Sequence, residues 1–584
     1  MNLSLQPHAM LHALHAVSRR MASLLPSCLG VSPCLLPFLL GGLLGVWGCK
    51  DLTGSPGLPS GTPNPVFYNN AAGALGMRNA AVFEFEQALP QYIVDAGLLT
   101  DELESLNTGA SVGVQLQTAG VTDPLDERIL PEGFSYGSSY ANLGKARGFA
   151  NQALGALAAY DTAAADMNTA KILRGELYAF EGYAEIMLAD LYCSGVPLST
   201  LDFQQNFTYA PSSTGKQVYQ DALAKFDTAL TLASASDSVV HLAQVGKGRV
   251  YLDLGQYAAA ADDVSAVPDG FLYQLAASWQ EGAGVNSNRI ADNNATVSDR
   301  EGENGLPFLS SGDPRTTVDT VAKAGNIFDG INLSVPLMFP TKYSAGLSGN
   351  GYAPITLASG VEARLIQAEA ALQAGEAVTW IQQLNNLRTN GNSSTTTRYA
   401  VNIFDTLWVT GCASDPAGCP DSVPASTSYA GFTIDSVFTV TVTPGSDAYN
   451  VCYNDAGSTL QECDDPYIVV AYSKGVLSTS KSYEAGTGGV SGLAPLTDPG
   501  TSLAQVSLMF NERAYWLFFT GHRQGDLRRL LRQYGQYFQV QNQVYPTGLY
   551  LAPGTGQYGA DVTVPIDPAE SANPLFHGCL DRKP

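Results

Sequence analysis

Histidine is scarce in this sequence: its 584 residues include six, and only His241, His522 and His577 follow residue 48. Because histidine is the commonest catalytic base and a frequent metal ligand, this scarcity argues against both uses. Neither a P-loop nor a His-Glu-x-x-His motif occurs, and no two cysteines have the Cys-x-x-Cys spacing of many zinc sites. We therefore expect a protein that is not an enzyme and that holds no cofactor and no metal.

Basic residues are also few, with 30 Lys and Arg against 53 Asp and Glu and a net charge of −23. Arg19 and Arg20 are the only charged residues before Lys50, so the rest of the chain has 28 basic against 53 acidic residues, or −25. This acidity disfavours nucleic acid and anionic membrane surfaces as partners. With 45% hydrophobic and 14% charged residues, the composition favours a folded core over disorder.

Long apolar runs are missing after residue 48, so we expect no later segment to cross a membrane. Before it, two arginines precede an apolar stretch that is densest over residues 35–47, which predicts a signal peptide over residues 1–48. The end of that stretch, Val46-Trp-Gly-Cys49, resembles a bacterial lipobox with Cys49 as the acylated residue, although Trp47 stands where a small residue is usual. An ordinary secretory signal with a chance cysteine is the alternative. Residues 49–66, rich in Gly, Pro, Ser and Thr, predict a flexible tether.

Six cysteines follow Cys49, and an even count in an exported chain predicts disulfides. The simplest local pairs join Cys412 with Cys419 and Cys452 with Cys463, which leaves Cys193 with Cys579. Other pairings remain open.

Apolar periodicity predicts a mainly α fold. Helical patterns fill residues 75–260, including helix pairs near 215–233 and 239–265, and another pair falls near 359–390. Small residues between Gly248 and Ala260 resemble those of tetratricopeptide helix hairpins, where they let paired helices approach closely.

Two long segments lack this periodicity. Residues 266–357 are rich in Gly, Asn, Asp and Pro and predict an irregular region that carries ligand-binding loops. Residues 391–498 alternate β-branched with polar residues and hold four of the six cysteines, which predicts a small disulfide-pinned β-rich insertion. The acidic loop 299–305 lacks EF-hand spacing, so we expect it to be solvated rather than to bind calcium.

The segment Asn511–Leu530 predicts two helices, near 502–520 and 524–534, separated by a glycine turn. Arg513 falls on the apolar face of the first helix, where an unpaired charge would cost several kcal/mol. We expect Glu512, Arg513, Arg523 and Asp526 to form a buried structural ion network; an anion or ligand site is the alternative.

Several short sequence motifs occur in the same order as the motifs of a known protein family. They are Cys49-Lys-Asp-Leu, Leu99-Thr-Asp-Glu102, Ala146-Arg-Gly-Phe-Ala-Asn151, Gly195-Val-Pro-Leu198, Asp313-Pro-Arg315, Lys342-Tyr343, Glu362–Ala370, Leu384-Asn-Asn-Leu-Arg388, Asn511–Leu530 and Val564-Pro-Ile-Asp567 with Asn573-Pro574. Together they resemble the SusD/RagB family of outer-membrane nutrient-binding lipoproteins. Thr520 stands where that family usually has an acid, and the 391–498 insertion is larger than the resemblance implies.

The resemblance implies a SusD-like body of tetratricopeptide-like helix pairs over residues 67–584, with long irregular loops on one face. It implies a lipid-anchored protein, exposed on the outer membrane, that caps a SusC-like TonB-dependent transporter and hands it a nutrient. A glycan is the favoured ligand, and a peptide is the alternative.

Aromatic rings in loops are the expected ligand contacts, because a flat ring stacks on the apolar face of a sugar. The candidates are Trp279, Phe134, Tyr136, Trp408 and Tyr429. Each of them could instead pack within its loop. Trp380 and Trp516 lie in helical patterns, where we expect core positions.

Two other functions remain open. The chain could be an envelope scaffold of helical repeats with no small-molecule ligand. It could also be a secreted hydrolase, because carboxylates are plentiful, although no spacing singles out a catalytic pair.

Overall fold

The computed structural model of this protein describes residues 70–105, 139–160, 167–278, 295–298, 304–321, 337–343, 352–389, 493–540, 543–546 and 562–581. It also gives the backbone of short strands between residues 400 and 477 and between 549 and 557. All of these residues belong to one unit, Val66–Pro584. The predicted signal peptide, Cys49 and almost all of the tether lie outside that unit, and none of them is among the described residues.

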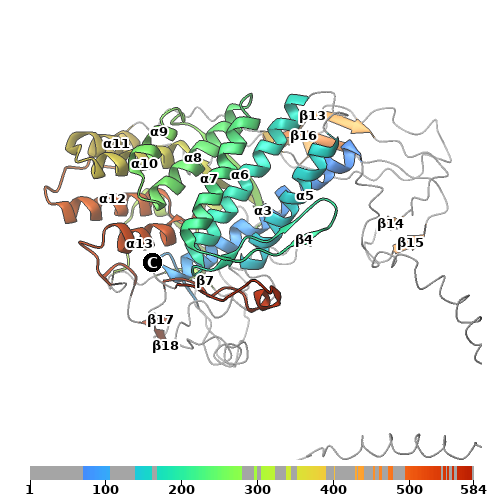
Figure 1. Cartoon of the computed structure of the whole chain (residues 1–584). Helices are drawn as coiled ribbons and strands as arrows, with labels where there is room; N and C mark the ends of the chain where they lie inside the picture. Colours follow the sequence, from blue (N-terminus) through green and yellow to red (C-terminus); the bar gives the residue numbers. More distant parts are fainter. Residues whose placement is uncertain are drawn as a thin grey trace, which may run out of the picture. The chain divides into compact units, whose positions relative to one another are not determined.

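Helices make up most of the described residues, so the prediction of a mainly α fold is confirmed (Figure 1). They are α3 (Ala71–Leu99), α5 (Ser139–Tyr160), α6 (Met167–Leu191), α7 (Gly215–Leu232), α8 (Asp237–Asp253), α9 (Tyr257–Asp263), α10 (Gly360–Gln373), α11 (Ala377–Thr389), α12 (Ser502–Trp516) and α13 (His522–Gln533). Consecutive helices pack on one another, with α6 against α7, α7 against α8, and α10 against α11. The predicted helix pairs near 215–265 and 359–390 therefore form.

Close packing of α6, α7 and α8 depends on small residues, as in tetratricopeptide hairpins. The buried ring of Phe226 on α7 lies against Gly182 of α6 and Gly246 of α8. A Cβ atom at Gly246 would fall 2.3 Å from the ring atom Cζ. After α8, Gly255 makes the turn into α9 with a φ of +72°, which favours glycine.

Antiparallel strand pairs connect the helical parts. In the segment 266–357, β6 (Leu272–Ser278) pairs with β10 (Tyr352–Ser359), and β8 (Val318–Val321) pairs with β9 (Leu337–Pro340). β1 (Leu103–Ser105) pairs with β7 (Ala295–Val297). The described residues of this segment therefore include paired strands, which no local sequence pattern reveals because the partners lie apart along the chain.

The region 391–498 contains β strands, as predicted. A four-stranded antiparallel sheet has the order β11 (Ala400–Val401), β16 (Ala471–Leu477), β13 (Phe432–Thr439), β12 (Ser428–Tyr429), and β14 (Val451–Tyr453) pairs with β15 (Leu460–Glu462). The side chains of Cys412, Cys419, Cys452 and Cys463 lie outside the described residues, so their predicted disulfides stay predictions.

Short hairpins complete the described strands. β2 (Val196–Pro197) pairs with β5 (Ser212–Ser213), and between them β3 (Thr200–Leu201) pairs with β4 (Phe207–Thr208). β17 (Leu549–Leu551) pairs with β18 (Thr555–Gln557). A disulfide joins Cys193, just before β2, to Cys579 in the C-terminal segment.

The junction between α12 and α13 differs in detail from the prediction. α12 ends at Trp516, four residues before the predicted end, because Phe519 adopts a φ of +55° that no helix can accommodate. Gly521 has a φ of +81° and is the N-cap of α13, so the predicted glycine turn is present. Within the residues that the structure describes, no helix has both the length and the apolar character needed to cross a membrane.

We predict that Gly246→Ala lowers the free energy of unfolding by about 1–3 kcal/mol, because the added methyl group overpacks the Phe226 ring. Gly144→Ala is the matched control, since this position on α5 is exposed and has no atom within 4 Å of the new Cβ. It should be neutral or stabilise by up to about 1 kcal/mol. Urea titration measures both variants, and equal effects would contradict this account of the helix packing.

Candidate functional site

Arg513 and Asp526 form a buried ion pair that joins α12 to α13. Arg513 is 1% exposed, and its Nε and Nη2 atoms donate to Asp526 Oδ2 and Oδ1 at 2.8 and 2.9 Å. Burial opposes ionisation of Asp526, but Arg513 and Arg529 hold the pKa of its carboxyl well below the ordinary value. The planar guanidinium meets the carboxylate through two parallel bonds, which fixes the relative orientation of the two helices.

A third helix joins this pair through Glu369 of α10. Arg529 donates to Asp526 Oδ1 at 2.6 Å and to Glu369 Oε1 at 2.5 Å, and the Tyr534 hydroxyl donates to the same Glu369 oxygen at 2.9 Å. Glu369 is fully buried, and these bonds replace the water that its carboxylate has lost. The network therefore ties α10, α12 and α13 together.

Glu512 points to a different set of partners. It accepts bonds from Arg315 Nη1 at 2.8 Å and from Arg388 Nε at 3.0 Å. Arg315 is itself paired with Asp313 at 2.7 Å, and its guanidinium lies 5.0 Å from the Trp516 ring. Glu512 thus links α12 to α11 and to the short 3₁₀ helix Pro314–Thr316.

Arg523 pairs outside the α12–α13 segment, with Asp101. Its Nε and Nη2 atoms donate to the Asp101 carboxylate at 2.7 and 2.8 Å, which joins α13 to the turn after α3. The four residues Glu512, Arg513, Arg523 and Asp526 therefore do not form one network among themselves. Only Arg513 and Asp526 bond directly, and the other two reach partners supplied by distant parts of the chain.

The unusual backbone of Phe519 is held by two buried charged groups. The Phe519 N–H donates to Glu102 Oε1 at 2.7 Å, and Lys342 Nζ donates to the carbonyl oxygen of Phe518. Burial raises the pKa of the Glu102 carboxyl to about 7 and lowers the pKa of the Lys342 ammonium to about 8. These bonds compensate a conformation that costs a non-glycine residue on the order of 1–3 kcal/mol.

His522 is part of the same buried region. Its Nε2 lies 3.2 Å from Glu362 Oε1, and its Nδ1 lies 2.7 Å from the Thr520 hydroxyl. Glu362 also binds Arg249 through two bonds of 2.7 and 2.9 Å. Burial and the nearby Arg249 guanidinium lower the pKa of the His522 imidazole.

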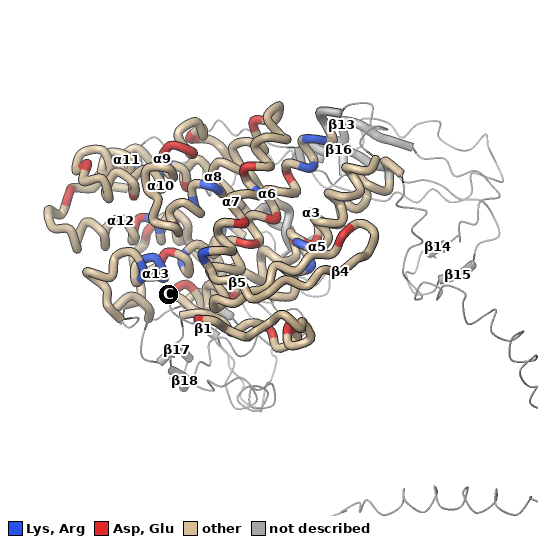
Figure 2. The backbone as a smooth tube through the Cα atoms, viewed as in Figure 1, with Lys and Arg blue, Asp and Glu red and all other residues tan. Residues whose placement is uncertain are grey.

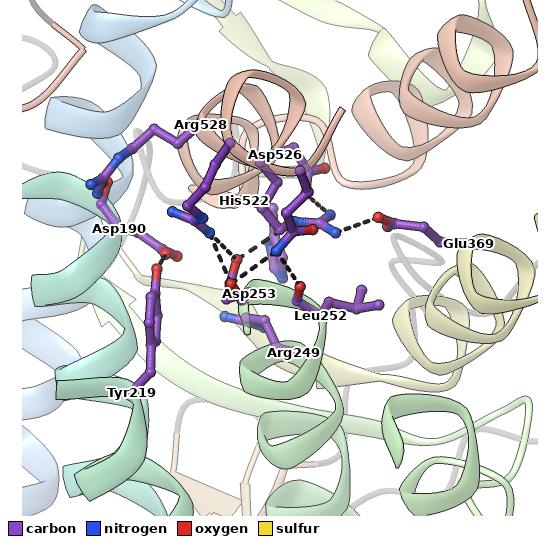
Figure 3. A network of polar contacts seen from close by, with 12 residues as sticks. Asp190, Tyr219, Arg249, Leu252, Asp253, Glu369, His522, Asp526 and Arg528 are labelled. Atoms are coloured by element: carbon purple, nitrogen blue, oxygen red, sulfur yellow. Dashed lines mark hydrogen bonds and ion pairs between the residues drawn. The ribbon is translucent and has the colours of Figure 1, made fainter. Parts of the chain in front are cut away.

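Further acids and tyrosines surround α13 (Figure 3). The Tyr219 hydroxyl donates to Asp190 Oδ1 at 2.5 Å, and the carbonyl oxygens of Ala189 and Asp190 accept from Arg528. Asp253 lies 3.5 Å from Arg529. Gly525 leaves room for this arrangement, because a Cβ there would fall 2.9 Å from Asp190.

Most partners of the α12–α13 segment come from the stretches that carried the family resemblance. Those partners are Asp101 and Glu102, Arg315, Lys342, Glu362, Glu369 and Arg388. Charged residues of both signs accordingly gather where α10, α12 and α13 approach one another (Figure 2). We call the buried assembly of the α12–α13 segment and these partners the clasp.

The clasp is poorly suited to bind a ligand. Its arginines face carboxylates or carbonyl oxygens of the protein, and the side chains of these ion pairs are at most 10% exposed. Among the described residues, no group of three or more His, Cys, Asp or Glu side chains is arranged to hold a metal ion. The arrangement can orient helices, and we assign it that structural role.

The side chains of the aromatic candidates for ligand contact are not among those that the structure describes. Trp279, Phe134, Tyr136 and Trp408 lie outside the described residues, and only the backbone of Tyr429 is described, in β12. Trp380 is fully buried and Trp516 is half-buried against Arg315. Their indole rings therefore belong to the packed body.

Solved structures resemble this chain. A SusD superfamily protein from Bacteroides thetaiotaomicron matches with a TM-score of 0.50 and 12% identity, over 87% of this chain and 99% of that chain. The chain has a SusD-like fold. A SusD superfamily protein from Bacteroides vulgatus matches with a TM-score of 0.48 and 12% identity, over 88% of this chain and 99% of that one. No protein-family model matches the sequence, and no curated protein matches it.

We predict that Arg513→Leu destabilises this SusD-like body by about 3–5 kcal/mol, because it removes one partner of a buried ion pair and leaves Asp526 half-paired. The loss should appear as a lower folding yield. Arg532→Leu, at a side chain on α13 that is 28% exposed, should cost less than about 1 kcal/mol. An Arg513→Leu protein that folds normally yet loses its ligand would assign the clasp to binding instead.

Stability should also depend on Glu102. Its folded pKa, about 7, lies above the ordinary 4.5, so its favourable contribution is complete below about pH 4.5 and is lost as the pH rises through 7. In Glu102→Gln, the fall in unfolding free energy between pH 5 and pH 8 should shrink by on the order of 2 kcal/mol. Glu376→Gln, at an exposed position, is the control. An unchanged pH dependence in Glu102→Gln would contradict the assignment.

Proposed function

We propose that this protein is a non-catalytic, lipid-anchored binding protein of the outer membrane that captures a glycan and delivers it to a SusC-like TonB-dependent transporter. Cys49 would carry the lipid, and residues 49–66 would tether the helical body. Trp279, Phe134, Tyr136, Trp408 and Tyr429 are the proposed ligand contacts. A peptide in place of the glycan is the alternative ligand.

One observation carries the proposal: a chain whose N-terminus resembles a lipoprotein signal has a SusD-like fold. The lipobox-like Val46-Trp-Gly-Cys49 supports export and anchoring, and the fold supports membership of a nutrient-uptake system. The acidic charge supports a partner other than nucleic acid.

The structural role of the clasp supports a non-catalytic function. The carboxylates of the clasp are engaged by arginines, a tyrosine or a backbone N–H, so they are not placed as an acid and base facing a substrate. Recognition is then left to neutral contacts from loops, where stacking on aromatic rings and hydrogen bonds from amides suit a sugar.

We predict that the purified chain without residues 1–49 binds members of a combined glycan and peptide array. Trp279→Ala should weaken binding to the recognised ligand by at least about tenfold, because it removes a stacking surface. Phe149→Ala is the matched control, since Phe149 is an exposed aromatic residue on α5 and is 37% exposed.

The array separates the alternatives. Binding to peptides alone would replace the glycan by a peptide, and binding to nothing would favour the interaction scaffold. Release of sugar products from an array glycan would instead indicate a hydrolase. Unchanged affinity in Trp279→Ala would remove that residue from the site.

A further inference from the structure

Two exposed aromatic rings stand side by side on the β3–β4 hairpin. Phe207 is 54% exposed and Tyr209 is 45% exposed, and their ring centroids are 4.9 Å apart in an edge-to-face arrangement. They are two residues apart along an extended strand, which places both rings on the same face. Figure 1 shows the hairpin, labelled at β4, as a loop beside the helices.

The turn that presents these rings is ordered by its own hydrogen bonds. Asp202 accepts from the Asn206 backbone N–H at 2.8 Å and from its side-chain amide at 2.9 Å, and the Asp202 N–H donates to the Asn206 carbonyl at 3.0 Å. Gln205 takes a φ of +68° to close the turn. The rings therefore do not need to be ordered when a ligand binds, which lowers the entropic cost of binding.

The base of the hairpin is fixed to the body on both sides. Phe203 packs on Gly155 and contacts the Tyr160 ring of α5. On the other side, the Asn573 side chain donates to the Ala210 carbonyl at 2.9 Å. The Cys193–Cys579 disulfide holds this C-terminal segment beside the start of the hairpin.

The surroundings of the rings favour a neutral ligand with many hydroxyl groups. Residues 199–213 contain no basic residue, and their single charge, Asp202, is engaged in the turn. Gln204, Gln205 and Asn206 are exposed next to the rings. Aromatic faces flanked by amides match the apolar faces and hydroxyl rim of a sugar, whereas residues 199–213 offer an anionic polymer no basic side chain of their own.

We propose that Phe207 and Tyr209 form a further contact for a neutral glycan chain, in addition to the aromatic candidates that the sequence suggests. This inference rests on the proposed glycan-binding function and extends it by one contact. Two contacts on one polymer raise its apparent affinity, because the second contact forms at high local concentration.

The test is native affinity electrophoresis in gels that contain a soluble neutral polysaccharide: amylopectin, β-1,3-glucan, xyloglucan or mannan. Polygalacturonate is the anionic comparison. The wild type should be retarded by at least one neutral polymer, and the Phe207→Ala/Tyr209→Ala double variant should bind that polymer about tenfold more weakly. Phe207→Tyr should retain binding, because a ring remains. Thr208→Ala, on the intervening residue, is the matched control.

Other outcomes overturn the proposal. If the double variant, with an unchanged melting temperature, binds the polymer as tightly as the wild type while Trp279→Ala does not, the further contact is wrong and glycan binding stands. If the wild type binds no polymer and no array glycan, both proposals fail. If the double variant keeps its glycan affinity but no longer co-purifies with an outer-membrane barrel protein, the rings form a protein-docking surface.

Discussion

The buried ion pair between Arg513 and Asp526 is the interaction on which the rest of the structure depends. Removing both charges from water costs several kcal/mol each, and the pair is tolerated because two parallel bonds and a further arginine, Arg529, satisfy the carboxylate. Those bonds have narrow geometric requirements. The pair therefore specifies how α12 lies against α13, and Glu369 extends the same requirement to α10.

The clasp separates the structural from the recognition residues of the chain. Its charges are satisfied within the protein, so mutations there should act on folding, while surfaces with little charge remain free to meet a ligand. The Phe207–Tyr209 pair is one such surface among the described residues: exposed, neutral and held by an ordered turn. A neutral polymer is not repelled by the negative net charge of an acidic protein.

The sequence predicts the local features of this fold well and the long-range ones poorly. Apolar periodicity and glycine positions locate α7, α8, α10 and α11, and a charge on an apolar face indicates that Arg513 needs a buried partner. The partners of Glu512 lie 197 and 124 residues away, and no local pattern connects them. The early end of α12 also escapes prediction from the local sequence, because the Phe519 conformation depends on Glu102 and Lys342 from other parts of the chain.

A double-mutant cycle on Arg513 and Asp526 tests the central claim, that this pair is a structural clasp, most directly. The measurement is the free energy of unfolding of the wild type, Arg513→Met, Asp526→Leu and the double variant. We expect each single variant to be strongly destabilised and the double variant to be less destabilised than the sum, with a coupling of at least about 1 kcal/mol. Additive effects would mean that the two residues do not act together and would contradict the account.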